Sequence, residues 1–239
     1  MEFIEAPSPN FGPRTAPPFM IVLHYTGMQG GEAALARLRD PASAVSAHYM
    51  VEEDGRVFRL VAEERRAWHA GKSSWRGVTD VNTASIGIEI VNPGHEFGYR
   101  DFPEAQVAAV IALAADIRTR WQVEDVNIVG HADVAPDRKE DPGERFPWKR
   151  LAEAGHGLWV EAAAAPGAPL AEGEESTAVF ALQAGFTRLG YDSAPTGKFD
   201  AHTAAVVRAF QRHWRPGRVD GVADGETRAR LIALLRLIG

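Results

Sequence analysis

The sequence contains no cysteine among its 239 residues. A chain without thiols cannot form a disulfide, a thiolate zinc finger or a cysteine nucleophile. All three are therefore excluded. The same absence says little about the redox state of the compartment, because a protein without thiols is indifferent to it.

Long apolar runs and an excess of basic residues are also missing. No stretch approaches the roughly 20 apolar residues of a membrane-spanning helix, and the first residues lack the basic and apolar regions of a signal peptide. The formal net charge is −6, whereas phosphate binding needs a basic face. We therefore expect no membrane span, no nucleic-acid partner and a cytoplasmic monomer; a periplasmic location is the alternative if a leader has been removed.

Composition divides the chain into two parts. Residues 161–175 consist mainly of Ala, Gly, Pro and Glu, which predicts a linker. Three helical patterns follow, and Asp200 and Asp224 are suited to cap the second and third. Their approximate ranges are 178–189, 201–214 and 226–238. We expect one large domain at 1–160, a linker at 161–175 and a three-helix domain at 176–239.

Strand and helix patterns alternate in the first part, which predicts the α/β class. Apolar runs indicate buried strands, and Asp54-Gly55 is suited to a type I′ hairpin turn. Residues 101–104 resemble a capping box in front of a helix. The predicted strands are 19–25, 47–51, 56–61, 85–91 and 126–129, and the predicted helices are 32–39 and about 104–121.

Two of the eight histidines, His24 and His131, lie where predicted buried strands end. If these strands are parallel, both side chains lie at the same edge of the sheet, where ligands are commonly bound. Asp141 follows in the next loop, which Pro136 and Pro142 stiffen. Two imidazoles and one carboxylate form a ligand set typical of catalytic zinc, with a fourth position left for water. The alternative is that each histidine is a structural hydrogen-bond donor.

Glu89 places a carboxylate in the middle of an apolar strand. It is either paired with a cation, because an isolated buried charge is costly, or a general base whose pKa is adjusted by its surroundings. Lys139 is either a solvated loop residue or a group that stabilises an oxyanion. No nucleophile elbow and no glycine-rich phosphate loop is present. Water activated by a metal is therefore the best-supported route to hydrolysis.

Five separated motifs resemble those of the zinc-dependent N-acetylmuramoyl-L-alanine amidases, the amidase-2 group related to T7-type lysozymes and peptidoglycan recognition proteins. They are Val22-Leu-His24-Tyr-Thr26, Ser46-Ala-His48-Tyr49, Trp68-His-Ala-Gly71, Ser85-Ile-Gly-Ile-Glu89, and Gly130-His-Ala-Asp-Val-Ala-Pro136 with Arg138-Lys-Glu-Asp-Pro-Gly143. This resemblance covers about residues 7–160 and implies a mixed central sheet flanked by helices. Residues 175–239 are similar to a small three-helix peptidoglycan-binding module, through Leu182-Gln183, Leu189-Gly190-Tyr191, Gly197-Lys-Phe-Asp200, Thr203, Ala209-Phe-Gln211 and Asp220-Gly221.

The resemblance implies one zinc ion per chain, held by His24, His131 and Asp141. Glu89 would activate the water, and Lys139 would stabilise the tetrahedral intermediate. The substrate would be the amide between N-acetylmuramic acid, or its 1,6-anhydro form, and L-alanine, cleaved in cell-wall turnover and muropeptide recycling. Residues expected near the substrate are Trp68, His69, Ala70, Asn10 and Tyr25. His48 and Tyr49 are expected to have structural roles near the site.

Two rival interpretations remain at this point. A non-catalytic peptidoglycan receptor could be built on the same fold, but a receptor needs only the groove and no open metal position. The complete set of presumed ligands, together with Glu89, therefore favours the enzyme. A weaker alternative makes the C-terminal module the functional part and the first domain its scaffold.

Overall fold

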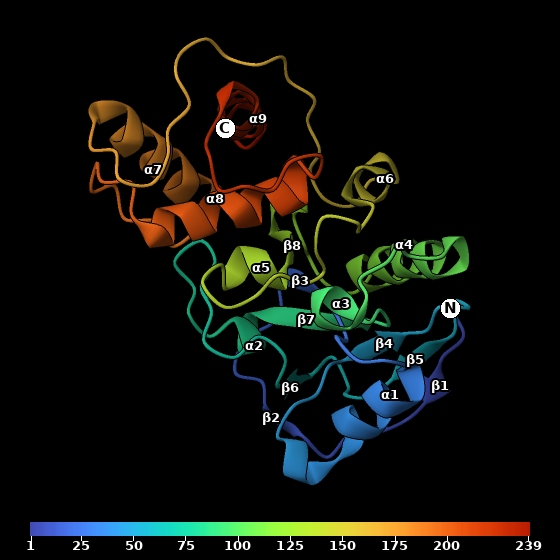
Figure 1. Cartoon of the computed structure of the whole chain (residues 1–239). Coiled ribbons are helices and arrows are strands. Elements are labelled where there is room, and N and C mark those ends of the chain that lie inside the picture. Colours follow the sequence, from blue (N-terminus) through green and yellow to red (C-terminus); the bar gives the residue numbers. More distant parts are fainter.

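The computed structural model describes residues 1–239 and is built on a six-stranded mixed sheet (Figure 1). The strand order is β1-β5-β4-β7-β3-β8, and only the pairing of β4 with β5 is antiparallel. The bounds are β1 Ile4–Glu5, β5 Val57–Arg59, β4 Tyr49–Val51, β7 Ser85–Ile90, β3 Met20–Tyr25 and β8 Ile128–Gly130. The predicted α/β class with a mixed central sheet is confirmed.

The three strands β7, β3 and β8 fix the position of the site. Their residues are almost entirely buried, as expected for parallel strands covered on both faces. The register pairs His24 with Glu89 and Leu23 with Gly130. Because the three strands are parallel, their carboxyl ends lie at one edge of the sheet. Residues more than a hundred positions apart in the sequence are thereby brought together.

Helices cover both faces of this sheet (Figure 1). The longest in the first part, α4 (Glu104–Arg118), buries an apolar stripe against β3 and β7. Helix α1 (Gly31–Arg39) buries Ala34 and Leu38 in a smaller cluster beside β4 and β5. The remaining elements of the first part are β2 Phe11–Pro13, η1 Pro41–Ser43, β6 Arg65–Ala67, α2 Val81–Ala84, α3 Gly94–Phe97, η2 Asp125–Asn127, α5 His131–Val134 and α6 Trp148–Glu153.

Three local predictions differ from the structure. The hairpin forms, but only Gly55 has a positive φ (88°), so the turn is not type I′, which requires positive φ at both central residues. No capping box forms before α4, because the side chain of Asp101 pairs with Arg145 at 2.8 Å instead. The strand predicted at 126–129 is shifted toward its carboxyl end, since η2 occupies its first residues.

The C-terminal helices are α7 (Thr177–Leu189), α8 (Ala201–Trp214) and α9 (Gly225–Leu237). The predicted caps are confirmed, because Asp200 accepts the backbone N–H of Thr203 and Asp224 accepts that of Thr227. One apolar cluster joins residues of these helices, such as Phe186 and Phe210, to Met20 and Val129 of the sheet. The helices are therefore packed firmly on the first part, with α8 next to α5 (Figure 1).

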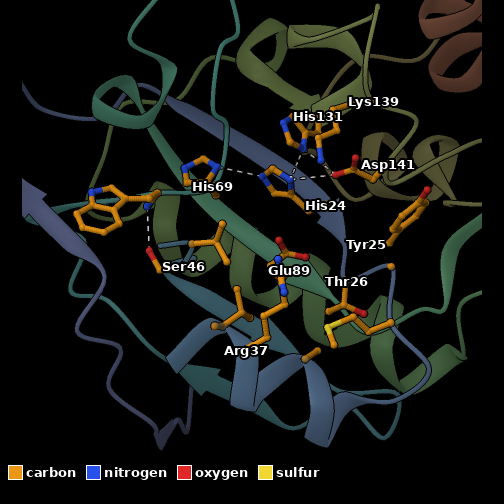
Figure 2. Close-up of a pocket in the computed structure, with 16 residues that line it drawn as sticks. His24, Tyr25, Thr26, Arg37, Ser46, His69, Glu89, His131, Lys139 and Asp141 are labelled. Carbon is orange, nitrogen blue, oxygen red and sulfur yellow. Dashed lines mark hydrogen bonds and ion pairs between the residues drawn. The ribbon is translucent and has the colours of Figure 1, made fainter. Parts of the chain in front are cut away.

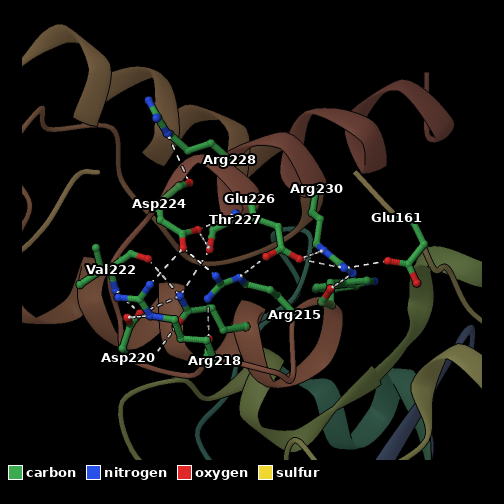
Figure 3. Close-up of polar contacts among 12 residues, drawn as sticks. Glu161, Arg215, Arg218, Asp220, Val222, Asp224, Glu226, Thr227, Arg228 and Arg230 are labelled. Atoms are coloured by element: carbon green, nitrogen blue, oxygen red, sulfur yellow. Dashed lines mark hydrogen bonds and ion pairs between the residues drawn. The ribbon is translucent and has the colours of Figure 1, made fainter. Parts of the chain in front are cut away.

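The segment 161–175 has no helix and follows the surface of the C-terminal helices. Leu170 forms an isolated bridge with Ala223, and Arg230 binds Glu161 at 2.8 Å (Figure 3). Arg230 also donates to the carbonyl of Val160 at 2.9 Å. These contacts attach the segment to α9. No helix of the chain has the length and apolarity needed to cross a membrane.

Candidate metal centre and catalytic pocket

His24, His131 and Asp141 meet at the carboxyl edge of the sheet (Figure 2). The Nδ1 atoms of the two histidines are 2.9 Å apart, and each is 3.0 Å from Oδ2 of Asp141. All three residues are buried. Two nitrogen lone pairs and one carboxylate oxygen thus face a single point, a donor set typical of a catalytic zinc site.

The protonation states suit metal binding. Burial and the neighbouring His131 lower the pKa of His24 to about 4, so its imidazole is neutral at pH 7. Burial alone would raise the pKa of Asp141, but His131 and His24 outweigh this and hold it well below its usual value. Metal ligands must be deprotonated to bind. The neutral imidazole of His24 and the ionised carboxylate of Asp141 therefore suit a divalent metal.

A chain of hydrogen bonds fixes the orientation of His24. Its Nε2–H donates to Nδ1 of His69 at 3.0 Å, and Nε2–H of His69 donates to the hydroxyl of Ser85 at 3.2 Å. The Ser85 hydroxyl in turn donates to the carbonyl of Val81. This tautomer leaves Nδ1 of His24 free for a ligand bond, as partners of metal-bound histidines commonly do. Gly87 makes the arrangement possible, because a Cβ there would lie 2.5 Å from the His69 ring.

Hydrogen bonds with backbone groups hold His131 and Asp141 in place. Nε2–H of His131 donates to the carbonyl of Ala70 at 3.1 Å, which again leaves Nδ1 free. The backbone N–H of Ala132 donates to the carbonyl of Asp141 at 2.8 Å. The short helix α5 therefore determines the position of two of the three possible ligands.

Glu89 lies next to this cluster and differs from it in having no partner. It forms no ion pair, and its buried Oε2 atom has no hydrogen-bond partner. Burial raises its pKa well above the usual range, the charge of Asp141 adds to this, and Lys139 partly offsets it. The structural interpretation of Glu89 as one half of a buried ion pair is therefore wrong. A carboxyl group without a partner beside a metal-ligand set has the properties of a general base.

The cavity in front of these residues has a volume of about 300 Å³. It is lined by five of the residues predicted for catalysis or metal binding and by three of those predicted near the substrate. These are His24, His131, Asp141, Glu89 and Lys139, with Tyr25, Trp68 and His69. Lys139 forms no ion pair or side-chain hydrogen bond, so its ammonium is free to interact with a ligand (Figure 2).

Asn10 and Ala70 are not brought to the cavity. The amide of Asn10 is buried and donates to the carbonyls of Asp40 and Val45, both at 2.8 Å. It therefore holds the segment after α1 rather than a substrate. Ala70 is fully buried, and its carbonyl orients His131 from behind.

The structural roles expected for His48 and Tyr49 agree with the contacts. Nδ1 of His48 accepts the N–H of Gly87 at 2.9 Å, and the Tyr49 hydroxyl donates to Glu63 at 2.7 Å. Both side chains are buried and neither lines the cavity.

One wall of the cavity was not predicted. Ala34, Arg37 and Leu38 of α1 line it, and Arg37 has no ion pair or side-chain hydrogen bond (Figure 2). These residues have the i, i+3, i+4 spacing of one helix face. The only available signal was an arginine between two apolar positions of the predicted helix 32–39. Thr26, Met28, Val45 and Ser46 also line the cavity.

An α/β sheet with a His-His-Asp donor set and a free carboxyl group at its carboxyl edge is an arrangement found in metal-dependent hydrolases. Comparison with known proteins narrows this class. Residues 14–144 match the N-acetylmuramoyl-L-alanine amidase family, and residues 175–231 match a putative peptidoglycan binding domain. The chain belongs to the N-acetylmuramoyl-L-alanine amidase family, as its motifs predicted.

Several relatives extend the likeness beyond the family match. N-acetylmuramoyl-L-alanine amidase AmiD of Escherichia coli K12 is 39% identical over 240 residues, covering 92% of this chain and 83% of that protein. The structure of AmiD with the substrate anhydro-N-acetylmuramic acid-L-Ala-D-gamma-Glu-L-Lys superposes with a TM-score of 0.79 and 38% identity, over 95% and 93% of the two chains. AmpDh3 of Pseudomonas aeruginosa with anhydromuramic pentapeptide gives a TM-score of 0.77 at 34% identity, over 93% of each chain.

A shorter relative matches only part of this chain. A crystal structure of AmpD is 32% identical with a TM-score of 0.57, and it covers 63% of this chain but 92% of its own. An amidase fold of this family thus exists in a chain that matches less than two thirds of the present one.

Proposed function

We propose that this protein hydrolyses the amide between N-acetylmuramic acid, or its 1,6-anhydro form, and the L-alanine of peptidoglycan stem peptides, in cell-wall turnover. The observation that carries the proposal is the convergence of His24, His131 and Asp141 beside the unpartnered carboxyl of Glu89. The likeness to AmiD in complex with an anhydro-muropeptide supports the choice of substrate.

Nδ1 of His24, Nδ1 of His131 and Oδ2 of Asp141 would hold one zinc ion per chain. The donor set fits zinc, because it offers two neutral imidazoles and one carboxylate and no thiolate. Zinc bound there would supply Lewis acidity, which polarises the amide carbonyl and makes water a stronger nucleophile near neutral pH.

Glu89 would act on the protons of the reaction. Its carboxylate accepts a proton from the attacking water as the new C–O bond forms, and it then delivers that proton to the amine as the C–N bond breaks. The products are a lactyl carboxylate on the sugar and a peptide with a free amino group on L-alanine. The second proton of the water leaves the new carboxyl group and converts the amine to ammonium, so one water molecule is consumed for each amide cleaved.

Lys139 and the cavity walls would determine where the amide binds. The ammonium of Lys139 has no protein partner and stabilises the negative charge that develops on the carbonyl oxygen. Tyr25, Trp68 and His69 line the same cavity and would contact the sugar or the first residues of the peptide. His69 has a second role, since it orients His24.

The division into a catalytic domain at 1–160, a linker at 161–175 and a three-helix domain at 176–239 is part of the same proposal. The separate matches of residues 14–144 and 175–231 support it. The helical domain would bind glycan of the wall.

Incubation of the protein with anhydro-N-acetylmuramic acid-L-Ala-D-γ-Glu-L-Lys, followed by mass spectrometry, tests the activity. We expect two products whose summed mass exceeds the substrate by one water, namely the free sugar acid and the intact tripeptide. A protein that binds this compound but leaves it intact would instead be the non-catalytic receptor considered above.

A further inference from the structure

Asp133 is a buried carboxyl group that the proposed mechanism does not use. It lies in α5, two positions after His131, and its residue is 2% exposed. It accepts three hydrogen bonds. One comes from the backbone N–H of Gly130 at 2.8 Å, so Asp133 closes the turn from β8 into α5.

The other two hydrogen bonds come from the C-terminal helices. The hydroxyl of Tyr191, which follows α7, donates to Oδ1 of Asp133 at 2.5 Å. Nδ1–H of His213 in α8 donates to Oδ2 at 2.7 Å. The donors are 58 and 80 residues away in the sequence, and each is 2% exposed. Water therefore cannot replace either donor without a local opening of the interface.

Both donors are themselves firmly held. The ring of Tyr191 packs edge-on against Trp75 at 5.1 Å, and the preceding Gly190 accepts the N–H of Arg76 at 2.7 Å. Gly190 has a φ of 145°, and a Cβ there would lie 2.7 Å from Trp75. The close approach of this segment to the catalytic part therefore depends on glycine.

His213 is held by stacking. Its ring lies 3.6 Å from that of Trp148 in α6 and 3.6 Å from that of Trp214. Trp148 belongs to the catalytic part, so α8 contacts that part through the face of His213 as well as through its Nδ1 atom. The donor positions are thus set by rigid packing rather than by flexible side chains.

The turn that Asp133 closes carries the metal ligands. His131 is its first helical residue, and the N–H of Ala132 fixes the backbone of Asp141 at 2.8 Å. A displacement of residues 130–133 would therefore move two of the three ligands relative to His24, which a different strand holds. Groups that orient metal ligands from outside the coordination sphere typically change metal affinity about 10–100-fold when they are lost.

We propose that Tyr191 and His213 are positioning residues of the metal centre, and that the C-terminal helices hold the ligand-bearing turn in place through Asp133. The inference rests on the zinc site of the proposed function. It gives the C-terminal part a second task beyond any contact with the wall.

The test uses Tyr191→Phe in the full chain, with Tyr49→Phe as the matched control. Both substitutions remove one hydroxyl from a buried tyrosine that donates to a buried carboxylate, but Glu63 beside Tyr49 lies outside the metal centre. Zinc affinity is measured by competition with a chromophoric chelator. Turnover is measured with the soluble anhydro-muropeptide, which needs no wall binding.

We expect Tyr191→Phe to weaken zinc binding about tenfold and to lower kcat with little change in KM, because the cavity walls are unchanged. Tyr49→Phe should retain the zinc affinity of the wild type. His213→Leu should weaken zinc binding as well, and His213→Asn should recover part of it, since its amide can donate near the position of Nδ1. If His213 contributed only to overall stability, both variants should lose zinc affinity to a similar extent.

Three results would overturn the proposal. One is a Tyr191→Phe protein with unchanged zinc affinity and kcat. Another is an effect confined to insoluble peptidoglycan, which would show that the C-terminal part acts only by binding the wall. A wild-type protein that binds no zinc would overturn the proposed function together with this inference, whereas the first two results would leave the proposed function intact.

Discussion

The catalytic pocket and the C-terminal helices differ in whether their charged side chains have protein partners. In the C-terminal part, Arg215 and Arg230 are each less than 10% exposed, and both are paired with carboxylates and backbone carbonyls (Figure 3). In the pocket, Glu89 and Lys139 have no protein partner. Paired groups stabilise a fold, whereas groups left without partners are available for a substrate.

Two carboxylates in the first part of the chain, Glu63 and Glu89, show the same contrast. Burial would raise the pKa of Glu63, but hydrogen bonds from Arg120, Tyr49 and Trp121 outweigh it and hold the pKa below its usual value. Burial raises the pKa of Glu89, and no such bonds oppose it. The partners of Glu63 therefore suit a stabilising role, whereas Glu89 remains available for the proposed chemistry.

The largest expected effect is that of Glu89→Gln. Loss of the general base should lower kcat about 10²–10⁴-fold. The stability of the protein should be unchanged or higher, because an unpartnered buried carboxyl group is removed. Steady-state kinetics and thermal unfolding of the same sample measure both. Full activity in this variant would show that another group takes the proton.

Arg230→Met should lower stability and leave turnover almost unchanged, the opposite of Glu89→Gln. Arg230 pairs with Glu226 and Glu161 and donates to the carbonyls of Val160 and Trp214. The guanidinium is buried, but the side chains of Glu226 and Glu161 are 34% and 58% exposed. We therefore expect a loss of about 1–3 kcal/mol of stability, mainly from the two carbonyls left without a donor. Urea denaturation should show this loss, while turnover of a soluble substrate at 25 °C stays near the wild-type value. A large loss of turnover with intact stability would show that Arg230 serves the catalytic pocket and not the stability of the helices.

The smallest effect is the pH dependence that Glu63 contributes. Its folded pKa is lowered, so its stabilising contribution is complete above the unfolded value of about 4.3 and is lost as the pH falls through the folded pKa. Glu63→Gln should be less stable than the wild type by about 1–3 kcal/mol at pH 7. The gap should narrow by pH 3. Urea midpoints at the two pH values measure it, and a gap that widens in acid would show that the sign is wrong.

The sequence predicted the residues of the site better than their surroundings. His24 and His131 could be placed because each lies where an apolar strand ends, and parallel strands bring their ends together. Asn10 was misplaced, because no local pattern shows that its amide binds the segment after α1.

Contacts between distant segments could not be predicted either, because no local sequence pattern shows them. The position of α1 across the cavity, which brings Arg37 to its wall, depends on packing and not on the pattern of the helix itself. The hydrogen bonds of Tyr191 and His213 to Asp133 connect segments 58 and 80 residues apart. Periodicity and capping signals describe single elements and contain no information on such pairs.

The metal content of the purified protein tests the central claim most directly, when it is measured together with amide cleavage. After removal of metal with a chelator, titration with zinc should restore cleavage in proportion to binding and saturate at one zinc ion per chain. His24→Ala, which removes one of the three donors, should bind zinc far more weakly and remain inactive at that zinc concentration. Cleavage by the metal-free protein, or undiminished zinc binding in His24→Ala, would contradict the account.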